Sequence, residues 1–241
     1  MESISDRIKH LLQRIDQAEA AAGRPPGSVR LIAVGKTFPA GDLLAAYRAG
    51  LHHFGESYLQ EALIKQTSLG HCDITWHFIG PIQSNKSRAI ATHFQWVHSV
   101  DRLKIAERLN EQRPPALPPL NVCLQINVSG EASKSGVRFE ELPTLAEAVL
   151  DLPRLRLRGL MGIPAPDQPV ERQRADFRRL RTALEDLAIE GVDTLSMGMS
   201  DDLEAAVMEG ATMVRIGSAL FGERPRKPTA TLSDRPAGPV S

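Results

Sequence analysis

Eight short strand-like segments alternate with amphipathic segments along this chain of 241 residues, and this alternation limits its possible folds more than any other feature. A short apolar run such as residues 31–35 is typical of a strand buried on both faces, whereas the segments between the strands have helical spacing. The predicted strands span residues 31–35, 52–55, 76–80, 96–100, 122–128, 157–163, 194–198 and 213–217. The predicted helices between them span residues 42–49, 58–66, 84–92, 101–110, 139–150, 170–189 and 201–209.

This order of elements predicts an α/β fold, an eight-stranded parallel β/α (TIM) barrel, because each strand is followed by a helix or a short turn. An open, doubly wound sheet is the alternative. That fold is disfavoured because no Gly-x-Gly-x-x-Gly turn follows the first predicted strand.

Two segments lie outside the repeated units. Residues 4–15 have apolar side chains at helical spacing and predict an extra N-terminal helix, with Ser3 or Ser5 as its cap. Residues 224–241 are rich in proline, serine and threonine and have almost nothing to bury, so we expect a disordered tail. Residues 1–223 are then expected to form a single domain.

The composition argues against several classes of protein. Lys+Arg and Asp+Glu number 29 each, so the chain has no net charge, which argues against binding to nucleic acid or to anionic membranes. No apolar run approaches the length of a transmembrane helix, and the N-terminus lacks the apolar core of a signal peptide. Cys72 and Cys123 are isolated and lack metal-site spacing, which suits a reducing compartment. We therefore expect a cytoplasmic protein that holds no metal.

Lys36 stands at the end of the first apolar run. Strand alternation places it on the same face as Ile32 and Val34, toward the interior of a barrel. A desolvated lysine has a lowered pKa and becomes nucleophilic, which imine formation with an aldehyde requires. The alternative is a strand-end lysine whose amine reaches solvent.

Two turns suited to anion binding follow the last two predicted strands. Residues 196–202, SMGMSDD, contain Ser200 and open a predicted helix, and Gly217 and Ser218 form the second turn. In β/α barrels the loops at these positions frequently bind phosphate through backbone N–H groups. The alternative for Ser200 is to cap its helix, a role compatible with phosphate binding.

Two polar residues occupy inward positions of predicted strands. Arg215 alternates with apolar neighbours in the last strand, which places it toward the barrel mouth beside Lys36. A guanidinium there needs a ligand or an acidic partner, for which Glu56 is a candidate. His77, in the third strand, is expected to be a hydrogen-bonded core histidine rather than an acid or base, because its spacing sets no carboxylate partner.

Several segments, in the same order, resemble one known family. WHFIGPIQSNK at residues 76–86 is similar to the signature of the YggS/PROSC proteins, the pyridoxal phosphate homeostasis family. The resemblance extends from about residue 4 to residue 222, and independent motifs in the right order make it specific. The supporting segments are AVGKT at 33–37, FGESYLQE at 54–61, SKSG at 133–136, SMGMSDD at 196–202 and VRIG at 214–217.

The resemblance implies a barrel similar to the N-terminal domain of alanine racemase, with pyridoxal phosphate bound as an imine on Lys36. It also implies that Ser200, Gly217 and Ser218 hold the phosphate and that Arg215 faces the pyridine nitrogen.

Two functions are compatible with such a site. The first is a pyridoxal phosphate-binding protein that stores, buffers or delivers the cofactor without being an enzyme; we expect a monomer, with apo pyridoxal phosphate enzymes as recipients. The alternative is an amino-acid racemase, which needs a proton donor or acceptor on each face of the substrate carbon. The racemase resembled by this barrel takes a tyrosine from an added C-terminal domain, whereas this chain is expected to end after its last strand. Tyr58 is the candidate substitute, and the neighbouring Ser57 replaces an asparagine usual in the family.

Overall fold

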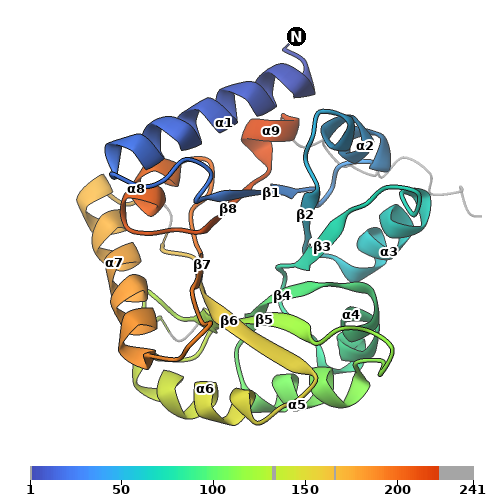
Figure 1. Ribbon diagram of the computed structural model, residues 1–241, viewed down its shortest axis with the longest axis vertical. Helices are drawn as coiled ribbons and strands as arrows, with labels where there is room; N and C mark the ends of the chain where they lie inside the picture. The colour runs from blue at the N-terminus through green and yellow to red at the C-terminus, as the bar shows by residue number, and fades with distance from the viewer. Residues whose placement is uncertain (1, 132–133, 166, 223–241) are drawn as a thin grey trace, which may run out of the picture.

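Eight parallel strands close into a barrel, and the helices form a ring around it (Figure 1). The computed structural model describes residues 2–131, 134–165 and 167–222. Each strand pairs with the next along the chain, and β8 closes the barrel by pairing with β1, with Arg30 opposite Met213 and Ala33 opposite Ile216. The strands are β1 (Arg30–Val34), β2 (His53–Glu56), β3 (Thr75–Phe78), β4 (Trp96–Val100), β5 (Leu120–Ile126), β6 (Leu155–Gly162), β7 (Thr194–Ser196) and β8 (Met213–Ile216).

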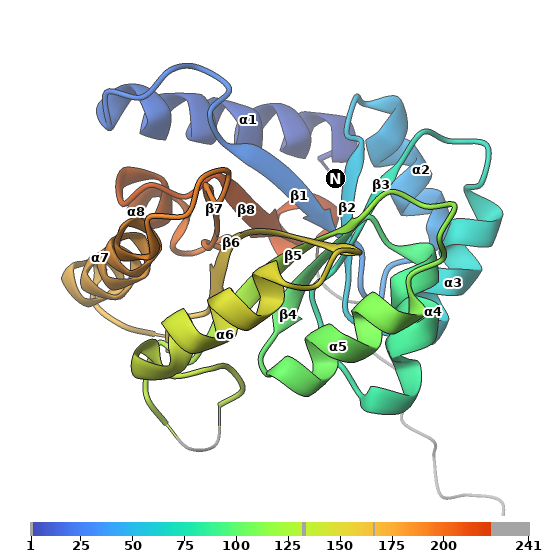
Figure 2. The same cartoon turned by 60° about the horizontal axis from the view of Figure 1, so that its bottom comes forward.

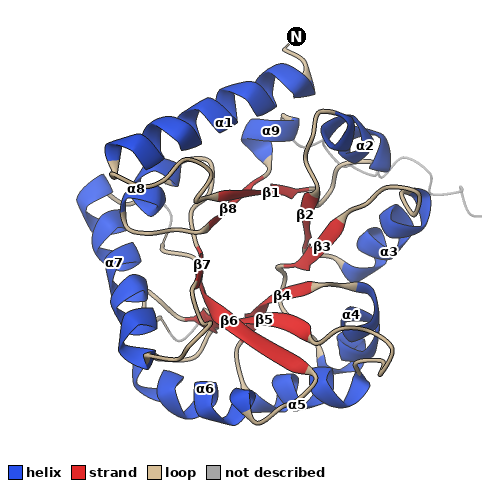
Figure 3. Cartoon of the chain, viewed as in Figure 1, coloured by secondary structure: helices blue, strands red, loops and turns tan. Residues whose placement is uncertain are grey.

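The predicted barrel is therefore confirmed, and the helices lie on its outside as expected (Figure 3). The expected boundary at residue 223 and the expected tail at 224–241 lie outside the described residues. Within the described ranges, no helix is long and apolar enough to cross a membrane. The helices are α1 (Ile4–Ala21), α2 (Ala40–Arg48), α3 (Leu59–Ser68), α4 (Ser87–His93), α5 (Leu103–Gln112), α6 (Leu142–Leu150), α7 (Val170–Leu187), α8 (Leu203–Met208) and α9 (Ser218–Phe221).

Three helical segments differ from the sequence prediction. The first turns of two predicted helices are separate 3₁₀ turns, η1 (Ser84–Lys86) and η2 (Phe139–Glu141). A proline in the first turn of α6 explains why that α-helix begins after η2, since proline favours the first helical positions. The short helix α9 follows β8 directly and was not predicted, because four residues are too few to show a helical period.

Helix α1 lies outside the repeated units and packs against α8, α9 and α2 (Figures 1 and 2). Its cap is Ser3, one of the two predicted, whose Oγ accepts a hydrogen bond from the backbone N–H of Asp6 at 3.1 Å. The buried side chains of α1 include Ile8, Leu11 and Ile15, which recur at helical spacing on one face. This face holds α1 against the part of the barrel that ends in β7 and β8.

Strand alternation divides the core into two parts. Outward-facing side chains such as Leu31 and Phe54 pack under the helices in one large cluster. Inward-facing side chains form a separate small cluster in the barrel lumen. This lumen cluster consists of Ile32, Trp96, Cys123, Met161 and Met213.

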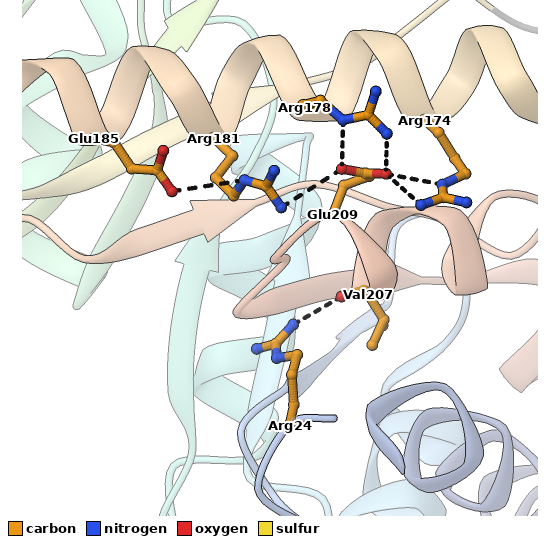
Figure 4. Close-up of polar contacts among 7 residues, drawn as sticks. All are labelled: Arg24, Arg174, Arg178, Arg181, Glu185, Val207 and Glu209. Carbon is orange, nitrogen blue, oxygen red and sulfur yellow. Dashed lines mark hydrogen bonds and ion pairs between the residues drawn. The ribbon is translucent and has the colours of Figure 1, made fainter. Parts of the chain in front are cut away.

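Outside the barrel, one buried carboxylate joins α7 to the end of α8. Glu209, which is only 2% exposed, accepts hydrogen bonds from Arg174 at 2.8 Å and from Arg178 at 2.9 and 3.2 Å (Figure 4). Arg181 adds an ion pair at 3.6 Å. Because the carboxylate is surrounded by donors of opposite charge, its burial is compensated locally. We call these four residues the outer arginine cluster.

Candidate functional site

The topology brings the predicted site residues to one side of the carboxyl-terminal end of the barrel. Lys36 follows β1, Ser200 follows β7, and Gly217 and Ser218 follow β8. Because β8 pairs with both β1 and β7, these three loops are neighbours. Arg215 lies within β8, opposite Ile32 in the register, and both side chains belong to the inward-facing set.

The backbone next to Lys36 is strained. Lys36 itself is half-buried, and Thr37 has a φ of 70°, in the left-handed region that β-branched residues rarely adopt. The backbone N–H of Thr37 donates to Oε2 of Glu61 at 3.1 Å. Its Oγ1 is buried and has no hydrogen-bond partner among the described residues. Strain and an unsatisfied hydroxyl beside a candidate nucleophile are typical of a ligand-binding position.

Glu56 does not pair with Arg215, so that alternative from the sequence is wrong. Lys65 of α3 donates to Oε1 of Glu56 and to the carbonyl oxygen of Gly35, each at 2.8 Å. Burial raises the pKa of Glu56 to about 7, although the charges of Lys65 and Lys36 act in the opposite direction. The pair lies between the strands and the helices, where it supports the residue that precedes Lys36.

Arg215 is held by uncharged acceptors. Nη1 donates to the carbonyl oxygen of Ser196 at 2.5 Å and to its Oγ at 2.8 Å, and Nη2 donates to the carbonyl oxygen of Gly162 at 3.1 Å. Among the described residues, no carboxylate lies within ion-pair distance of this guanidinium. Burial lowers the pKa of Arg215 to about 10, with Asp202 partly opposing the shift, so the side chain remains charged at neutral pH.

The turn after β7 contains a glycine in a conformation that other residues rarely adopt. Gly198 has a φ of 94°, and a Cβ there would lie 2.6 Å from the Cβ of Ala206, so the close approach requires glycine. Oδ1 of Asp202 accepts a hydrogen bond from the N–H of Met199 at 2.5 Å. Helix α8 begins at Leu203 with Asp202 as its N-cap residue, so the alternative that Ser200 caps this helix is wrong.

The turn after β8 is tightly packed against β1. A Cβ on Gly217 would lie 3.3 Å from the carbonyl oxygen of Val34, so a larger residue would push this turn away from β1. Ser218 is the first residue of α9 and is exposed, while Ser200 across the neighbouring loop is half-buried. The two turns therefore present their backbones and hydroxyl groups beside the end of β1.

Helix α1 braces both turns from outside, which the sequence did not predict. Nε of Arg7 donates to the carbonyl oxygen of Leu220 at 2.7 Å, within α9. Nη2 of Arg14 donates to the carbonyl oxygen of Ser200 at 3.1 Å, and its Nε and Nη2 both bond the carboxylate of Glu204. The extra helix thus contacts the backbone of the two turns that the sequence singled out.

A cavity of about 690 Å³ opens beside these residues. It is lined by residues of β5, β6 and their following loops, such as Gln125 and Met161, and by residues of the turn after β7, such as Asp202. None of the five predicted site residues is among its lining. The cavity adjoins them through Asp202, whose charge also acts on the pKa of Arg215.

A set of histidines lies in the lumen and was not predicted from the sequence. His77 is fully buried and hydrogen-bonded, as expected, but its partners are His53 and His98. His98 in turn contacts Ser196, which holds Arg215. The signal was present, because β2, β3 and β4 each carry a histidine at an inward position. No three His, Cys, Asp or Glu side chains in the described part of the chain are placed to bind a metal.

The two tyrosines lie in different environments. Tyr47 on α2 is half-buried, and its hydroxyl accepts a hydrogen bond from the backbone N–H of Asp73 at 3.2 Å. Tyr58 precedes α3 and is 53% exposed. Neither side chain is held in a buried, hydrogen-bonded position at the barrel mouth, where an opposite-face base would be needed.

Comparison with known proteins identifies close relatives over nearly the whole chain. Residues 6–225 match the family described as the alanine racemase N-terminal domain. The pyridoxal phosphate homeostasis protein of Pseudomonas aeruginosa is 65% identical over 224 residues, which are 93% of this chain and 97% of that protein. The Escherichia coli K12 protein of the same name is 51% identical over 229 residues, 93% of this chain and 98% of that protein.

Solved structures agree with this relationship. The structure of PipY from Synechococcus elongatus with PLP bound has a TM-score of 0.80 at 37% identity, covering 91% of this chain and all of that one. Alanine racemase from Corynebacterium glutamicum shares the fold, with a TM-score of 0.66 at 20% identity over 92% of this chain and 62% of that one. The family resemblance seen in the sequence motifs is thus confirmed. The chain belongs to the alanine racemase N-terminal domain family, in the group of the pyridoxal phosphate homeostasis proteins.

Proposed function

We propose that this protein binds pyridoxal phosphate, carries it as a Schiff base on Lys36, and serves to store, buffer or deliver the cofactor. Relatives with identities of 51% and 65% are pyridoxal phosphate homeostasis proteins, and PipY, at 37%, has been solved with PLP bound. The aldehyde of pyridoxal phosphate supplies the electrophile, and Lys36 supplies the amine.

The observation that carries this proposal is the charged, buried guanidinium of Arg215. Its described contacts use both Nη1 protons and one Nη2 proton, so the Nε proton and one Nη2 proton remain for a ligand. A pyridine nitrogen is a neutral acceptor that suits such a donor. Because arginine does not readily release a proton, the ring nitrogen stays unprotonated, which makes the ring a weaker electron sink than one facing an aspartate.

The phosphate in this proposal is bound by Ser200, Gly217 and Ser218. The turns after β7 and β8 lie side by side, and Gly217 brings its backbone close to β1. Hydroxyl groups and backbone N–H groups are the donors that phosphate sites use in this fold. The bracing of both turns by Arg7 and Arg14 keeps these donors in place before the ligand arrives.

The arrangement favours reversible carriage over enzymatic turnover. The hydroxyl of Tyr47 accepts a hydrogen bond from the backbone of Asp73, and Tyr58 is 53% exposed, so neither has the buried, fixed position that suits a catalytic base. A cavity of about 690 Å³ adjoins the site through Asp202 and offers room for a cofactor to enter and leave. In this proposal the protein acts in the cytoplasm as a monomer, and apo pyridoxal phosphate enzymes are its recipients.

Reduction with borohydride tests the proposal directly. The protein reconstituted with pyridoxal phosphate should absorb in the visible range, and borohydride should fix the label to the peptide that contains Lys36. Lys36→Ala should lose the visible band and the covalent label. The matched control Lys104→Ala, which removes an exposed lysine of α5, should keep both. Labelling of another lysine, or none in reconstituted protein, would contradict the assignment.

A second measurement tests the phosphate site. Each charge-assisted hydrogen bond to the phosphate contributes about 1.5–3 kcal/mol. Pyridoxal without phosphate should therefore bind at least about ten times more weakly than pyridoxal phosphate, as measured by spectroscopic titration. Equal affinities would contradict phosphate binding at these turns.

A further inference from the structure

A continuous row of hydrogen bonds crosses the barrel interior and ends at Arg215. Nδ1 of His53 lies 3.0 Å from Nε2 of His77, and Nδ1 of His77 lies 2.9 Å from Nε2 of His98. Nδ1 of His98 lies 2.7 Å from Oγ of Ser196, which accepts from Nη1 of Arg215 at 2.8 Å. We call His53, His77, His98 and Ser196 the histidine row. It links the first residue of β2 to the guanidinium in β8.

All three rings of the row are neutral at pH 7. Burial lowers the pKa of His53 to about 4, with Arg30 and His52 adding to the shift. Burial likewise lowers the pKa of His98 to about 3 and that of His77 well below its usual value. A neutral imidazole has one N–H donor and one acceptor nitrogen, so the row can run in only two directions.

The Ser196 hydroxyl selects between these directions. Its oxygen accepts a hydrogen bond from Nη1 of Arg215, so its O–H group is left to donate a hydrogen bond to Nδ1 of His98. In this direction His98 donates from Nε2 to His77, and His77 donates from Nε2 to His53. In the reverse direction Ser196 would receive two N–H donors and would have to place its proton on a third group.

A cation stands near each end of the row, and the two act in opposite directions. A positive charge favours N–H dipoles that point away from it. Arg30, near the His53 end, is exposed, so water and salt screen its charge. Arg215 is 5% exposed and touches Ser196 directly, so its field acts in a region of low dielectric constant. The buried cation therefore determines the direction.

We propose that the histidine row is a directional hydrogen-bond relay, with the proton of each ring on Nε2, and that it positions Arg215 for the ring nitrogen of the bound cofactor. The positioning part rests on the proposed function. With its proton committed to His98, Ser196 offers lone pairs to Arg215 and holds Nη1. The Nε proton and the second Nη2 proton then remain available to the ligand.

Long-range proton–nitrogen NMR correlations of the histidine side chains test the direction in protein without cofactor. All three rings are expected in the Nε2–H form, with a bare Nδ1. A ring of the row in the Nδ1–H form would overturn the proposal. This measurement needs no bound ligand, so a failure of pyridoxal phosphate to bind would contradict the proposed function and leave this result standing.

Two arginine variants test what sets the direction. Arg215→Met removes the buried cation and should shift the row toward the Nδ1–H forms, including at His53 on the far side of the barrel. Arg30→Met is the matched control, because it removes the competing exposed cation, and it should leave the Nε2–H forms in place. Unchanged tautomers in folded Arg215→Met, or a shift caused by Arg30→Met, would contradict the relay.

Two variants of His98 separate positioning from simple packing. The amide oxygen of Asn occupies the place of Nδ1, so His98→Asn keeps an acceptor for Ser196. The amide of Gln occupies the place of Nε2, so His98→Gln keeps the link to His77 and loses the contact with Ser196. Pyridoxal phosphate affinity, measured by spectroscopic titration, should fall about tenfold in His98→Gln and no more than about threefold in His98→Asn. Equal losses in the two variants would contradict positioning through Ser196.

Discussion

Two buried charged side chains, Glu209 and Arg215, are compensated by their surroundings in different ways. Glu209, outside the barrel, is 2% exposed and meets three arginines of α7. Arg215, inside the barrel, is 5% exposed and meets only uncharged acceptors among the described residues. An isolated buried charge is expensive unless it is hydrogen-bonded and paired. Glu209 has both hydrogen bonds and opposite charges around it, whereas Arg215 has hydrogen bonds alone.

The difference separates stability from function. Removing Glu209 would leave α7 and α8 without their central contact, while the arginines could still reach water because they are at least one-third exposed. Arg215 has N–H donors that its described contacts leave unused, so a ligand can accept from them. We therefore expect substitutions in the outer arginine cluster to change folding and substitutions at Arg215 to change ligand binding.

The largest effect is expected at Arg215. Arg215→Lys keeps the positive charge, but a single ammonium cannot reach Ser196, Gly162 and a ring nitrogen at once. Loss of two charge-assisted hydrogen bonds should weaken pyridoxal phosphate binding by about 30-fold or more, measured by spectroscopic titration. Glu209→Gln, as the control from the outer arginine cluster, should bind the cofactor normally. If the two variants had equal affinity, the separation of roles would be lost.

The next effect is on folding. Glu209→Gln keeps the shape of the side chain but removes the charge that Arg174 and Arg178 contact, so the free energy of unfolding should fall by about 2 kcal/mol in urea titrations at pH 7.

The pH dependence of the same variant sharpens this prediction. Burial alone raises the pKa of Glu209, but the hydrogen bonds from Arg178 and Arg174 and their charges outweigh it, so the pKa is lowered. A lowered folded-state pKa means that the stabilisation is present above the unfolded pKa of 4.5 and is lost as the pH falls through the folded-state pKa. The difference between wild type and Glu209→Gln should therefore shrink in acid. A difference that does not depend on pH would contradict the role of the charge.

The fold was predictable because its signal is repeated. Each of the eight strands begins within two residues of its predicted start, since each is a short strand-like segment bounded by a helix or turn. Closure of β8 on β1 followed from the number of units and not from any one residue. Short elements without a period, such as α9 and the turn before α8, were missed or misread for the same reason.

The site was only partly predictable. Lys36, Gly217 and Arg215 stand out because polar residues or glycines at strand ends are unusual in buried strands. The contacts of Ser196 with His98 and with Arg215 were not predicted, because strand pairing and not sequence spacing brings these side chains together. Only the closed barrel shows that His98 and Ser196, 98 positions apart, are in contact. The sequence indicates which strand positions face inward, but predicting contacts across the lumen requires the register of all the strands.

Glu56 provides a carboxylate with a pH dependence opposite to that of Glu209. It is fully buried and forms an ion pair with Lys65, and burial raises its pKa from 4.5 to about 7 although the charges of Lys65 and Lys36 oppose the shift. A raised folded-state pKa means that the stabilisation is present below pH 4.5 and is lost as the pH rises through 7.

Glu56→Gln tests this contrast, because it fixes the side chain in a neutral form. Between pH 5 and 7, wild type should lose stability relative to the variant by up to about 1.4 kcal/mol per pH unit, measured by urea unfolding across that range. The stability of wild type relative to Glu209→Gln should change with pH in the opposite direction, and at lower pH. Equal slopes in wild type and Glu56→Gln would mean that the number of cations around a buried carboxylate does not govern its pH dependence.

The smallest expected effect tests whether α1 belongs to the stabilising exterior or to the site. Arg14 is about one-third exposed, and its bonds to Glu204 and to the carbonyl oxygen of Ser200 are surface contacts, worth about 0.5 kcal/mol. If those contacts only hold α1 in place, Arg14→Ala should lower stability slightly and leave ligand binding unchanged. If they fix the turn at Ser200, pyridoxal phosphate affinity should fall about twofold while pyridoxal affinity stays constant, because only the phosphate contacts that turn.

We expect the second result, measured by parallel titration of the two ligands. Arg48→Ala, which removes an exposed arginine at the end of α2, serves as the control. Unchanged affinity for both ligands, or an equal loss for both, would contradict a role of Arg14 in the phosphate site and would place the boundary between stability and function at the two turns themselves.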